Sequence, residues 1–587
     1  MKMLSTPYQI MMIIATALVI YYPTLFAEIC LVDDYDAISY FFSQDTFSLK
    51  EIFFPQSAGG GYYRPLIGLS YLLDKQLWFL HERLMHFESV VAHTLNVLLV
   101  FYVCREAVNL HLKRRETWLP LAAALLFALH PIATESVNWI SGRTDIMMGT
   151  FVLVSVLCLL RFTQGRSKIL LAFAILSALT ACLAKEAAFG YLIGLPLFAL
   201  YRVDTVSTVE NQGYFAWLRL FLVYYLCAFF VALLFGSYWL VLGIALVYLA
   251  HISYNKFDIE NISVSAGRIV KYSGVLISVF AVSAGLFILL RRLAFTSSVS
   301  KIGQTFTLML ADINYTISLF LGAVGFYVKK FFIPLPLNFF ILEIDPLYDF
   351  VGIAVLLLFC HLILSKKLPA IFSLLGLLLL LPALPFAFGT IAWTAYAERY
   401  IYLSSAFWII AVCLWGGDWL GRNPARKRLV TMMVVIVCLF ASGITFKRNI
   451  VWQNNVTLMR DTVTQTPQIR KLRNIYIKAL LDKGMTDEAV KHYQLAATSL
   501  PSLAGDEQAA LMVSGKLIVK GSNNEALQLY QDALLSTHFK SEPLLIATIK
   551  LLQAMQSVGT VPEQERKRLE GLSNKYSSLL DEIDHNK

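Results

Sequence analysis

The twenty residues from Tyr8 to Ala27, YQIMMIIATALVIYYPTLFA, contain no charged side chain. An apolar helix of about 20 residues is long enough to cross a bilayer. Similar runs recur as far as Lys447, and the chain beyond that point is polar and charged. The chain as a whole is 57% apolar and 15% charged, against about 45–50% and about 25% in soluble domains. These values exclude an ordinary soluble protein and predict a polytopic membrane protein with a soluble C-terminal part.

Basic residues gather in short loops between the apolar runs, for example in 105–116, 165–168 and 422–428. Short basic loops mark the cytoplasmic side of a membrane protein. The first run lacks a small-residue cleavage pattern, so we interpret it as a retained span and not as a signal peptide. This orientation places the long polar loop 28–85 outside the cytoplasm, and it does the same for everything after the last span.

We expect an all-α fold with about 11–13 spans in residues 1–447. The expected spans are Tyr8–Ala27, His86–Cys104, Trp118–Thr134, Asp145–Phe162, Ile169–Leu183, Ala187–Tyr201, three near 219–236, 237–252 and 272–290, and a last one over Leu429–Phe446. Counting the spans from the N-terminus and from the C-terminus gives conflicting sides of the membrane around residues 312–350. A re-entrant segment over 312–342 that ends at Pro334 and Pro336 would reconcile them, and a miscounted span near 219–252 is the alternative. In the loop 28–85, the stretch Leu66–Leu80 is expected to form an interfacial helix.

Residues 448–587 carry a repeated small–large pattern and are expected to form a separate extracytoplasmic domain. The repeated positions are Gly484, Ala489, Tyr493, Ala496 and Pro501, followed by Gly521, Ala526, Tyr530 and Ala533. In a tetratricopeptide repeat, such small and large residues let paired helices interlock. We therefore predict tetratricopeptide-like (TPR-like) repeats, capped by helices over 449–470 and 543–582. Generic helical hairpins are the alternative.

Several common kinds of site find no support in the sequence. The eight cysteines lie almost all within apolar runs and show no CxxC or CxxH spacing, so they indicate neither disulfides nor a metal site. His86 and His93 would lie about 10 Å apart along one helix, which is too far to bind one ion together, so we interpret them as packing or interhelical hydrogen-bonding residues. No P-loop, G-x-S-x-G or H-E-x-x-H motif is present, which leaves ATP-driven transport and the common hydrolases without support.

Two adjacent carboxylates, Asp33 and Asp34, follow the first span within seven residues. Neighbouring carboxylates at a membrane edge raise each other's pKa, and such a pair suits a general base and a partner that orients it. The alternative is that they are ordinary solvated residues at the end of a span.

Other polar residues lie at the expected external ends of spans. The cations are Arg64, Arg143, Lys185 and Arg399, and the remaining residues are His130, Glu135, Asp145, Glu186, Glu398 and Tyr400. Taken singly, each is typical of an ion-paired or snorkelling helix end. Together, cations beside carboxylates on one membrane face could hold a phosphate or pyrophosphate near a base.

In this order, these motifs resemble the transmembrane and tetratricopeptide-repeat O-mannosyltransferase family, within the GT-C class of lipid-donor glycosyltransferases. The motifs that carry the resemblance are Asp33-Asp34, Tyr63-Arg-Pro-Leu66, His86 with His93, His130-Pro-x-x-x-Glu135, Gly142-Arg-x-Asp145, Ala184-Lys-Glu186, Ala397-Glu-Arg-Tyr-Ile-Tyr-Leu403 and Trp452. The chain departs from the family pattern at Ser89, Ala184 and Ser404, and its repeats are few. The departures bear on the acceptor more than on the fold or the donor.

The resemblance implies transfer of a sugar, with mannose as the family's suggestion, from a polyprenyl-phosphate donor to a hydroxyl of an extracytoplasmic protein or glycan, with inversion at the anomeric carbon. Asp33 would be the general base, and Asp34 would orient the base or the acceptor. The residues that would bind the donor phosphate and the substrate are Arg64, Arg143, Lys185, Arg399, Glu135, Asp145, Glu186, Glu398 and Tyr400. We expect no essential metal, because cations can stabilise a phosphate leaving group, although the external carboxylates leave room for Mg²⁺ or Mn²⁺. Nucleic acid is not an expected partner.

The short chain and few repeats favour a bacterial inner membrane over the endoplasmic reticulum, with the site and the C-terminal domain on the extracytoplasmic side. Two other function classes stay open. A membrane scaffold would recruit partners through its repeats, and its polar residues would be scattered. A transporter of lipid-linked sugars would show duplicated spans and charges near the membrane midplane. Convergence of the external polar residues on one cavity would distinguish the enzyme from both.

Overall fold

The computed structural model describes most of the chain. Its gaps are residues 1–4, 44–48, 55–61, 113–117, 166, 196–278, 280–281, 292, 295–300, 365–366, 500–505, 559–560 and 586–587. The expected spans near 219–236 and 237–252 therefore lie outside the described residues, as do the end of Ala187–Tyr201 and the first part of the span near 272–290.

The chain divides into two compact units, Met1–Gln453 and Asn454–Lys587. Regular structure in the described residues of both units is helical, apart from a single antiparallel bridge between Ile341 and Tyr396. The all-α prediction is confirmed for this part of the chain. The expected boundary at 447/448 lies close to the observed one at 453/454.

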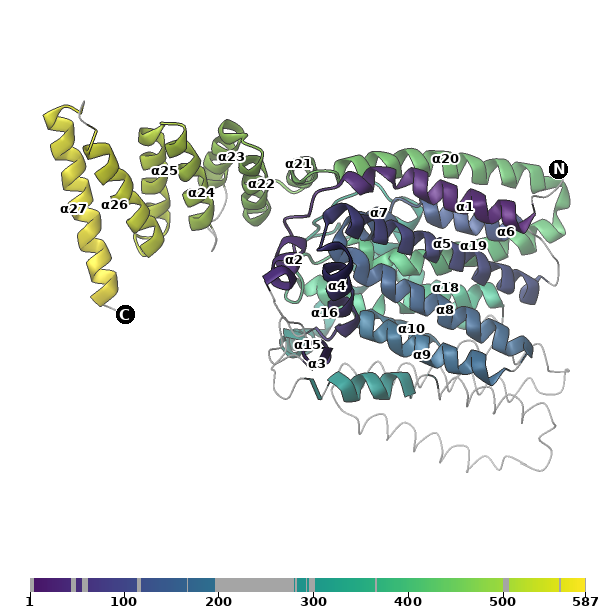
Figure 1. Ribbon diagram of the computed structural model, residues 1–587. Helices are drawn as coiled ribbons and strands as arrows, with labels where there is room; N and C mark the ends of the chain where they lie inside the picture. Colours follow the sequence, from purple (N-terminus) through teal and green to yellow (C-terminus); the bar gives the residue numbers. More distant parts are fainter. Residues whose placement is uncertain are drawn as a thin grey trace. The chain divides into compact units, whose positions relative to one another are not determined.

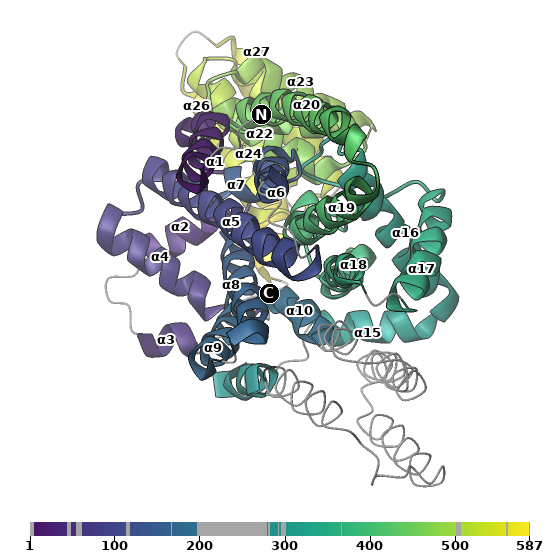
Figure 2. The same ribbon diagram turned by 90° about the vertical axis from the view of Figure 1, so that its right-hand side faces the viewer.

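The first unit is a bundle built around the long helix α5 (Figure 1). Its first half comprises α1 (Thr6–Ile20), η1 (Tyr22–Phe26), α2 (Asp34–Ser43), α3 (Leu49–Phe53), α4 (Pro65–Trp78), α5 (Glu82–His111), α6 (Trp118–Leu129), α7 (Ala133–Asn138), η3 (Ile140–Gly142), α8 (Arg143–Gly165), α9 (Lys168–Ala184), η4 (Glu186–Ala188) and α10 (Phe189–Gly194). Its second half comprises α15 (Lys301–Ala311), α16 (Ile313–Phe332), α17 (Tyr348–Leu364), α18 (Leu368–Leu378), η7 (Leu381–Phe388), η8 (Glu398–Ile401), α19 (Tyr402–Arg422), η9 (Pro424–Arg426) and α20 (Lys427–Val451). Helices α1, α6, α8 and α19 pack against α5, as Figure 2 shows from the side.

Five helical stretches of the described residues are long and apolar enough to cross a membrane, or six if one bent pair counts as a span. They are Glu82–His111, Ile140–Phe162, Leu368–Phe388, Glu398–Arg422 and Pro424–Val451. Shorter apolar helices include Thr6–Ile20, Trp118–Leu129 and Lys168–Ala184, each at an expected span. A helix is the expected form of such segments, because the lipid core offers no other partner for the backbone. The multi-pass prediction is confirmed.

The segment expected to be re-entrant, 312–342, begins at a sharp bend between two helices. Residues Gln304–Ala311 and the helix α16 meet at an angle of 108°. Helix α16 ends at Phe332, just before Pro334, which cannot donate a backbone hydrogen bond. The stretch Leu66–Leu80, expected to be an interfacial helix, is helical as α4.

Polar side chains inside the bundle tie three helices together. The Nδ1 atom of His93 in α5 lies 2.8 Å from the hydroxyl oxygen of Tyr402 in α19. Asn96, one turn further along α5, donates to that same hydroxyl at 3.1 Å and to the carbonyl of Ile146 in α8 at 2.9 Å. The hydrogen-bonding interpretation of His93 is therefore confirmed.

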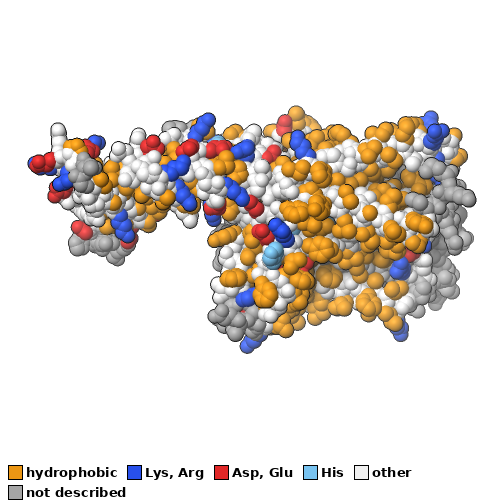
Figure 3. Space-filling view, turned by 45° about the horizontal axis from the view of Figure 1, so that its top comes forward, with side chains coloured by type: hydrophobic (Ala, Val, Ile, Leu, Met, Phe, Trp, Pro, Cys, Tyr) orange, Lys and Arg blue, Asp and Glu red, His pale blue; other side chains and the backbone are white. Residues whose placement is uncertain are grey.

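The outer surface of the first unit is apolar over wide areas, as Figure 3 shows in orange. In the apolar stretch of 18 residues that would cross the membrane in α20, only 6% is buried inside the bundle. Leu439 and Phe440 on that helix are about two-thirds exposed, at 66% and 67%. Such a surface is expected where a helix faces lipid.

The second unit is a series of helices whose repeated positions are equivalent. The helices are α21 (Asn455–Gln465), α22 (Arg470–Asp482), α23 (Thr486–Ser499), α24 (Asp506–Val519), α25 (Asn523–Ser536), α26 (Glu542–Gln556) and α27 (Glu563–His585). Gly484 and Gly521 both have positive φ, at 73° and 82°, at the turns before α23 and α25. The alanines and tyrosines of the pattern, Ala489, Tyr493, Ala496, Ala526, Tyr530 and Ala533, are all buried. Pro501 lies outside the described residues, and the TPR-like assignment stays a prediction.

Candidate functional site

Most of the polar residues expected at external span ends are brought together by the fold as ion pairs. The pairs are Arg64–Glu186, Lys185–Asp145, Arg399–Glu135 and Lys330–Glu398, which we call the ion-pair cluster. The partners in each pair are between 40 and 264 residues apart in the sequence. Three of the pairs are almost completely buried, whereas the side chains of Arg64 and Glu186 are 22% and 24% exposed.

Asp33 and Asp34 lie on a tight turn between η1 and α2, in different environments. Asp33 is exposed and has a positive φ of 60°, a conformation that a non-glycine residue adopts at some cost in energy. Asp34 is completely buried, and its carboxylate accepts hydrogen bonds from the backbone N–H of Ile140 at 3.2 Å and of Ser141 at 2.7 Å. Asp34 therefore anchors the turn, and the turn presents Asp33 to solvent.

The buried position of Asp34 has a consequence for the pH dependence of stability. Burial raises the pKa of Asp34 to about 7, although hydrogen bonds from Ser141 and Ile140 oppose the rise. A carboxyl group whose pKa is higher in the folded state stabilises the fold most below its unfolded pKa, and this contribution is lost as the pH rises through the folded pKa. We expect the protein to lose thermal stability between about pH 4 and about pH 7, and Asp34→Asn to flatten that part of the profile.

Thermal unfolding in detergent across the pH range measures this effect. Asp36→Asn is the matched control, because Asp36 is an exposed carboxylate in the same helix. It should leave the profile as in the wild type. Equal flattening by both variants would contradict the assignment to Asp34.

The segment 135–142 connects the turn of Asp33 with the ion-pair cluster. The indole N–H of Trp139 donates to the carbonyl of Val32 at 3.1 Å, and the guanidinium of Arg399 lies 4.7 Å above the Trp139 ring. Glu135 accepts the backbone N–H of Arg399 at 3.0 Å and also pairs with its guanidinium. The segment can fold back tightly because Gly142 has no side chain, and a Cβ there would lie 2.7 Å from the carbonyl oxygen of Ser136. A change in this segment would therefore move Asp33 and Arg399 together.

Tyr400 lies between two of the cations. The Nζ atom of Lys185 is 5.4 Å from the centre of its ring, and the guanidinium carbon of Arg399 is 4.9 Å away. Lys185 also pairs with Oδ1 of Asp145 at 2.6 Å, whereas Oδ2 of Asp145 is buried without a hydrogen-bond partner. In this part of the site, charged groups of both signs surround an aromatic ring. One carboxylate oxygen, Oδ2 of Asp145, can still accept a hydrogen bond from a ligand.

Arg64 is held differently, by a bidentate pair at the edge of the site. Its Nε and Nη2 atoms donate to the two carboxylate oxygens of Glu186 at 2.8 Å and 2.7 Å. Burial alone would raise the pKa of Glu186, but the guanidinium outweighs it and the pKa lies below its usual value. The guanidinium also lies 4.3 Å above the ring of Tyr62, whose hydroxyl donates to the carbonyl oxygen of Ile391 at 3.3 Å. Tyr62, which the sequence did not single out, thus packs against the cation at the edge of the site.

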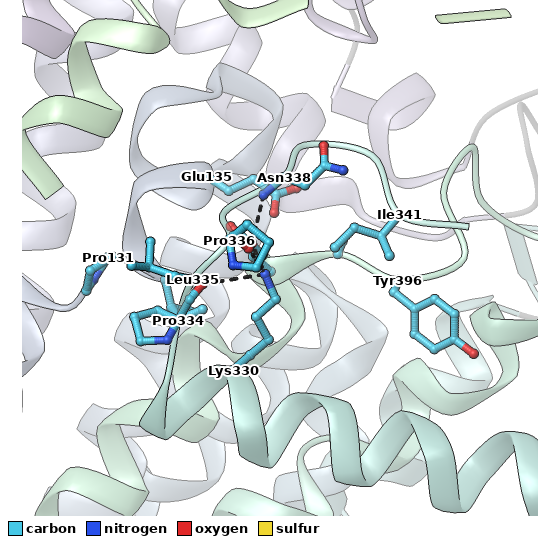
Figure 4. Close-up of polar contacts among 12 residues, drawn as sticks. Pro131, Glu135, Lys330, Pro334, Leu335, Pro336, Asn338, Ile341 and Tyr396 are labelled. Carbon is cyan, nitrogen blue, oxygen red and sulfur yellow. Dashed lines mark hydrogen bonds and ion pairs between the residues drawn. The ribbon is translucent and has the colours of Figure 1, made fainter. Parts of the chain in front are cut away.

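Lys330 is a second residue that sequence reasoning missed. It comes from the last turn of α16, and its Nζ atom donates to Oε1 of Glu398 at 2.7 Å and to the carbonyl oxygen of Pro336 (Figure 4). The backbone N–H of Asn338 donates to the same carboxylate oxygen at 3.0 Å. Its signal in the sequence is the pair Lys329-Lys330 at the end of an apolar run before Pro334, which the sequence analysis did not consider.

Arg143 lies apart from the ion-pair cluster. It pairs with Asp74 of α4, lies 4.6 Å above the ring of Tyr71, and donates to the hydroxyl of Ser70 at 3.3 Å. Its contacts therefore fasten α4 to the start of α8. His130 has a comparable packing role, because its Nε2 atom lies 3.0 Å from the carbonyl oxygen of Phe331.

A small cavity with a volume of about 20 Å³ lies against the ion-pair cluster. One side is polar and is formed by Arg64, Asp145, Lys185, Glu186 and Tyr400. The other side is apolar and is formed by Met148, Ala187, Leu379, Pro382, Ala383, Phe386 and Leu403, with Ser404 beside them. The lining is thus charged on one side and apolar on the other, which suits a ligand with one charged end and one apolar end. Among the described residues, no group of three or more His, Cys, Asp or Glu is arranged to hold a metal ion.

No protein-family model matches the chain. The chain is 36% identical over 104 residues, or 18% of its length, to "Protein O-mannosyl-transferase tmtc2" of Xenopus laevis. It is 36% identical over 85 residues, or 14% of its length, to "Protein O-mannosyl-transferase TMTC1" of Mus musculus, and 33% identical over 142 residues, or 23%, to "Protein O-mannosyl-transferase Tmtc1" of Drosophila melanogaster. The matches span 12%, 8% and 15% of these relatives' own lengths. Over these stretches the chain is similar to protein O-mannosyl-transferases.

Proposed function

We propose that this protein is a membrane glycosyltransferase that moves a sugar from a polyprenyl-phosphate donor to a hydroxyl group of an acceptor outside the cytoplasm. The observation that carries the proposal is the two-sided cavity, with Arg64 and Lys185 on its polar side and leucine, proline and phenylalanine on the other. The similarity to protein O-mannosyl-transferases supports a glycosyltransferase, with mannose as the sugar and a serine or threonine hydroxyl as the acceptor.

The donor's two chemical parts suit the two sides of the cavity. A polyprenyl phosphate has an apolar tail and an anionic head, and cationic side chains bind phosphate through charge-assisted hydrogen bonds. In the ligand-free chain each cation of the cluster already has a carboxylate partner. Arg64 has the most exposed side chain of the four cations, so it is the one that we expect to exchange part of its pairing with Glu186 for the donor phosphate.

The reaction would proceed as a single displacement. The acceptor hydroxyl loses its proton to the carboxylate of Asp33, and its oxygen bonds to the anomeric carbon from the face opposite the phosphate. The bond between that carbon and the phosphate oxygen breaks, so the configuration inverts and polyprenyl phosphate leaves. Cations near the leaving oxygen stabilise the charge that develops there, which is the role that a metal ion fills in other transferases. Asp34 acts indirectly, through the turn that presents Asp33.

Transfer and donor hydrolysis by the detergent-purified full chain test the proposal. A panel of polyprenyl-phosphate hexoses, mannose included, is offered with a serine- and threonine-containing peptide and with lysate acceptors. Turnover of one donor would establish a transferase and identify its sugar. Donor binding without turnover under all acceptor conditions would overturn the proposal in favour of a transporter or a scaffold.

Arg64→Gln gives a narrower test of donor recognition. A hydrogen bond to a charged group contributes about 1.5–3 kcal/mol, so we expect KM for the donor to rise roughly tenfold to hundredfold with a smaller change in kcat. Arg161→Gln is the matched control, because Arg161 forms an exposed ion pair with Glu106 that does not line the cavity. An unchanged KM in Arg64→Gln would show that the phosphate binds elsewhere.

A further inference from the structure

A second cavity lies at the opposite ends of the helices that build the candidate site. Helix α19 begins at Tyr402 beside the ion-pair cluster and ends 20 residues later at Arg422, a rise of roughly 30 Å, which is about the thickness of the hydrocarbon core. The second cavity has a volume of about 380 Å³ and is formed by the ends of α5 and α19 and the beginnings of α6 and α20. It is lined by His111, Leu112, Trp118, Leu119, Gly417, Asp418, Leu420, Gly421, Arg422, Pro424 and Lys427.

The lining has an excess of positive charge at its mouth. The lining contains the carboxylate of Asp418, whose Oδ2 atom lies 2.8 Å from Nε2 of His111. Arg422 and Lys427 are exposed at the rim. In the part of the chain that the structure describes, no carboxylate forms an ion pair with Arg422. The mouth can therefore bind an anion, and a phosphate is the anion that a guanidinium fits best in two-point contact.

The deeper lining and the neighbouring surface are apolar. The inner wall is formed by Trp118, Leu119 and Leu420. Gly417 also lines the cavity, and a larger residue would not fit there, because a Cβ would lie 2.6 Å from the side chain of Leu112. From the cavity, α20 continues with exposed apolar residues at one-turn spacing, namely Leu429, Met432, Met433 and Ile436, each 48–57% exposed. A hollow with cations at its rim thus opens onto an apolar stripe that runs along a membrane-spanning helix.

We propose that this cavity binds one anionic phospholipid, with its phosphate on Arg422 and Lys427 and its acyl chains along α20. Basic pockets between transmembrane helices suit such head groups, because the charge is bound at the surface while the tails stay in the bilayer. A tryptophan at this depth, as Trp118, is typical of the membrane interface. The inference is independent of the proposed transfer reaction, since no residue of the second cavity belongs to the ion-pair cluster.

Native mass spectrometry of the full chain in detergent tests the proposal, with phosphatidylglycerol as the anionic probe and phosphatidylcholine as the zwitterionic one. We expect the wild type to retain phosphatidylglycerol preferentially. Each cation near the surface is expected to strengthen binding roughly fivefold, so the double variant Arg422→Gln/Lys427→Gln should weaken it roughly thirtyfold. The matched control is Arg426→Gln/Arg428→Gln, which removes two exposed cations of the same segment that do not line the cavity.

Three results would overturn the proposal. Equal binding of the two lipids by the wild type would show that the cavity does not recognise the anionic head group. An equal loss in both double variants would show that only the general charge of the segment matters. Displacement of the lipid by inorganic phosphate at the same concentration would show a site for a free anion. Because all four substituted residues are exposed, the variants are expected to fold, and size-exclusion chromatography checks this directly.

Discussion

Replacing Asp33 by asparagine is expected to lower the rate of sugar transfer by a factor of about 10²–10⁴, the usual contribution of a general base. The amide cannot accept the proton of the acceptor hydroxyl at neutral pH. Asparagine is also among the residues that best tolerate positive φ, so the turn with φ of 60° should keep its shape. Transfer is measured with the donor identified in the panel, and donor binding and thermal stability are measured alongside.

Asp36→Asn is the control for this variant, because it removes a second exposed carboxylate three residues further along, in the first turn of α2. It should leave turnover within a few-fold of the wild type. Near-normal turnover in Asp33→Asn would show that another group is the base. A loss of donor binding in that variant would show that Asp33 acts in binding instead.

Lys330→Met is expected to destabilise the fold by about 3–5 kcal/mol, the typical effect of removing one partner of a buried ion pair. The side chains of Lys330 and Glu398 are only 3% and 2% exposed, so the variant would leave the Glu398 carboxylate buried without its cation. It would also leave the carbonyl oxygen of Pro336 without that donor. The change should appear as a large drop in the thermal unfolding temperature in detergent.

The double variant Lys330→Met/Glu398→Gln separates charge burial from packing. It removes both charges, and the glutamine can still accept the backbone N–H of Asn338, so much of the lost stability should return. Lys329→Met is the matched control, because the neighbouring lysine donates only to the carbonyl of Leu335 near the surface, and its loss should cost under about 1 kcal/mol. A double variant no more stable than Lys330→Met would argue against an electrostatic cause.

The positions of the helices in the first unit were predictable because the relevant physics is local. A run of about 20 apolar residues without charge must satisfy its backbone groups within itself, and a helix does so. The expected spans Trp118–Thr134 and Asp145–Phe162 accordingly coincide with α6 followed by α7, and with α8. The equivalent positions of the small and large residues in successive helix pairs of the tail were predictable for the same reason, because the repeated pattern is local.

The partners in the site were not predictable from spacing. The sequence placed Arg64, Glu135, Lys185 and Arg399 at span ends, but which carboxylate each cation meets depends on how distant helices pack. Arg399 pairs with a residue 264 positions away, and Arg143, which has a similar local setting, pairs with Asp74 of α4. Lys330 was overlooked because a lysine at a helix end has no local signal that distinguishes a snorkelling side chain from a buried one.

The sequence by itself determined the class of fold, the order of the apolar and polar segments, and the residue types at the span ends, because hydrophobic length and helical periodicity act over a few turns. Only the tertiary structure decided that Asp34 is buried and Asp33 exposed. That difference comes from Ile140, Ser141 and Trp139, which reach the turn from more than 100 residues away. Two adjacent carboxylates of the same chemistry were thus given different environments by contacts that no local pattern contains.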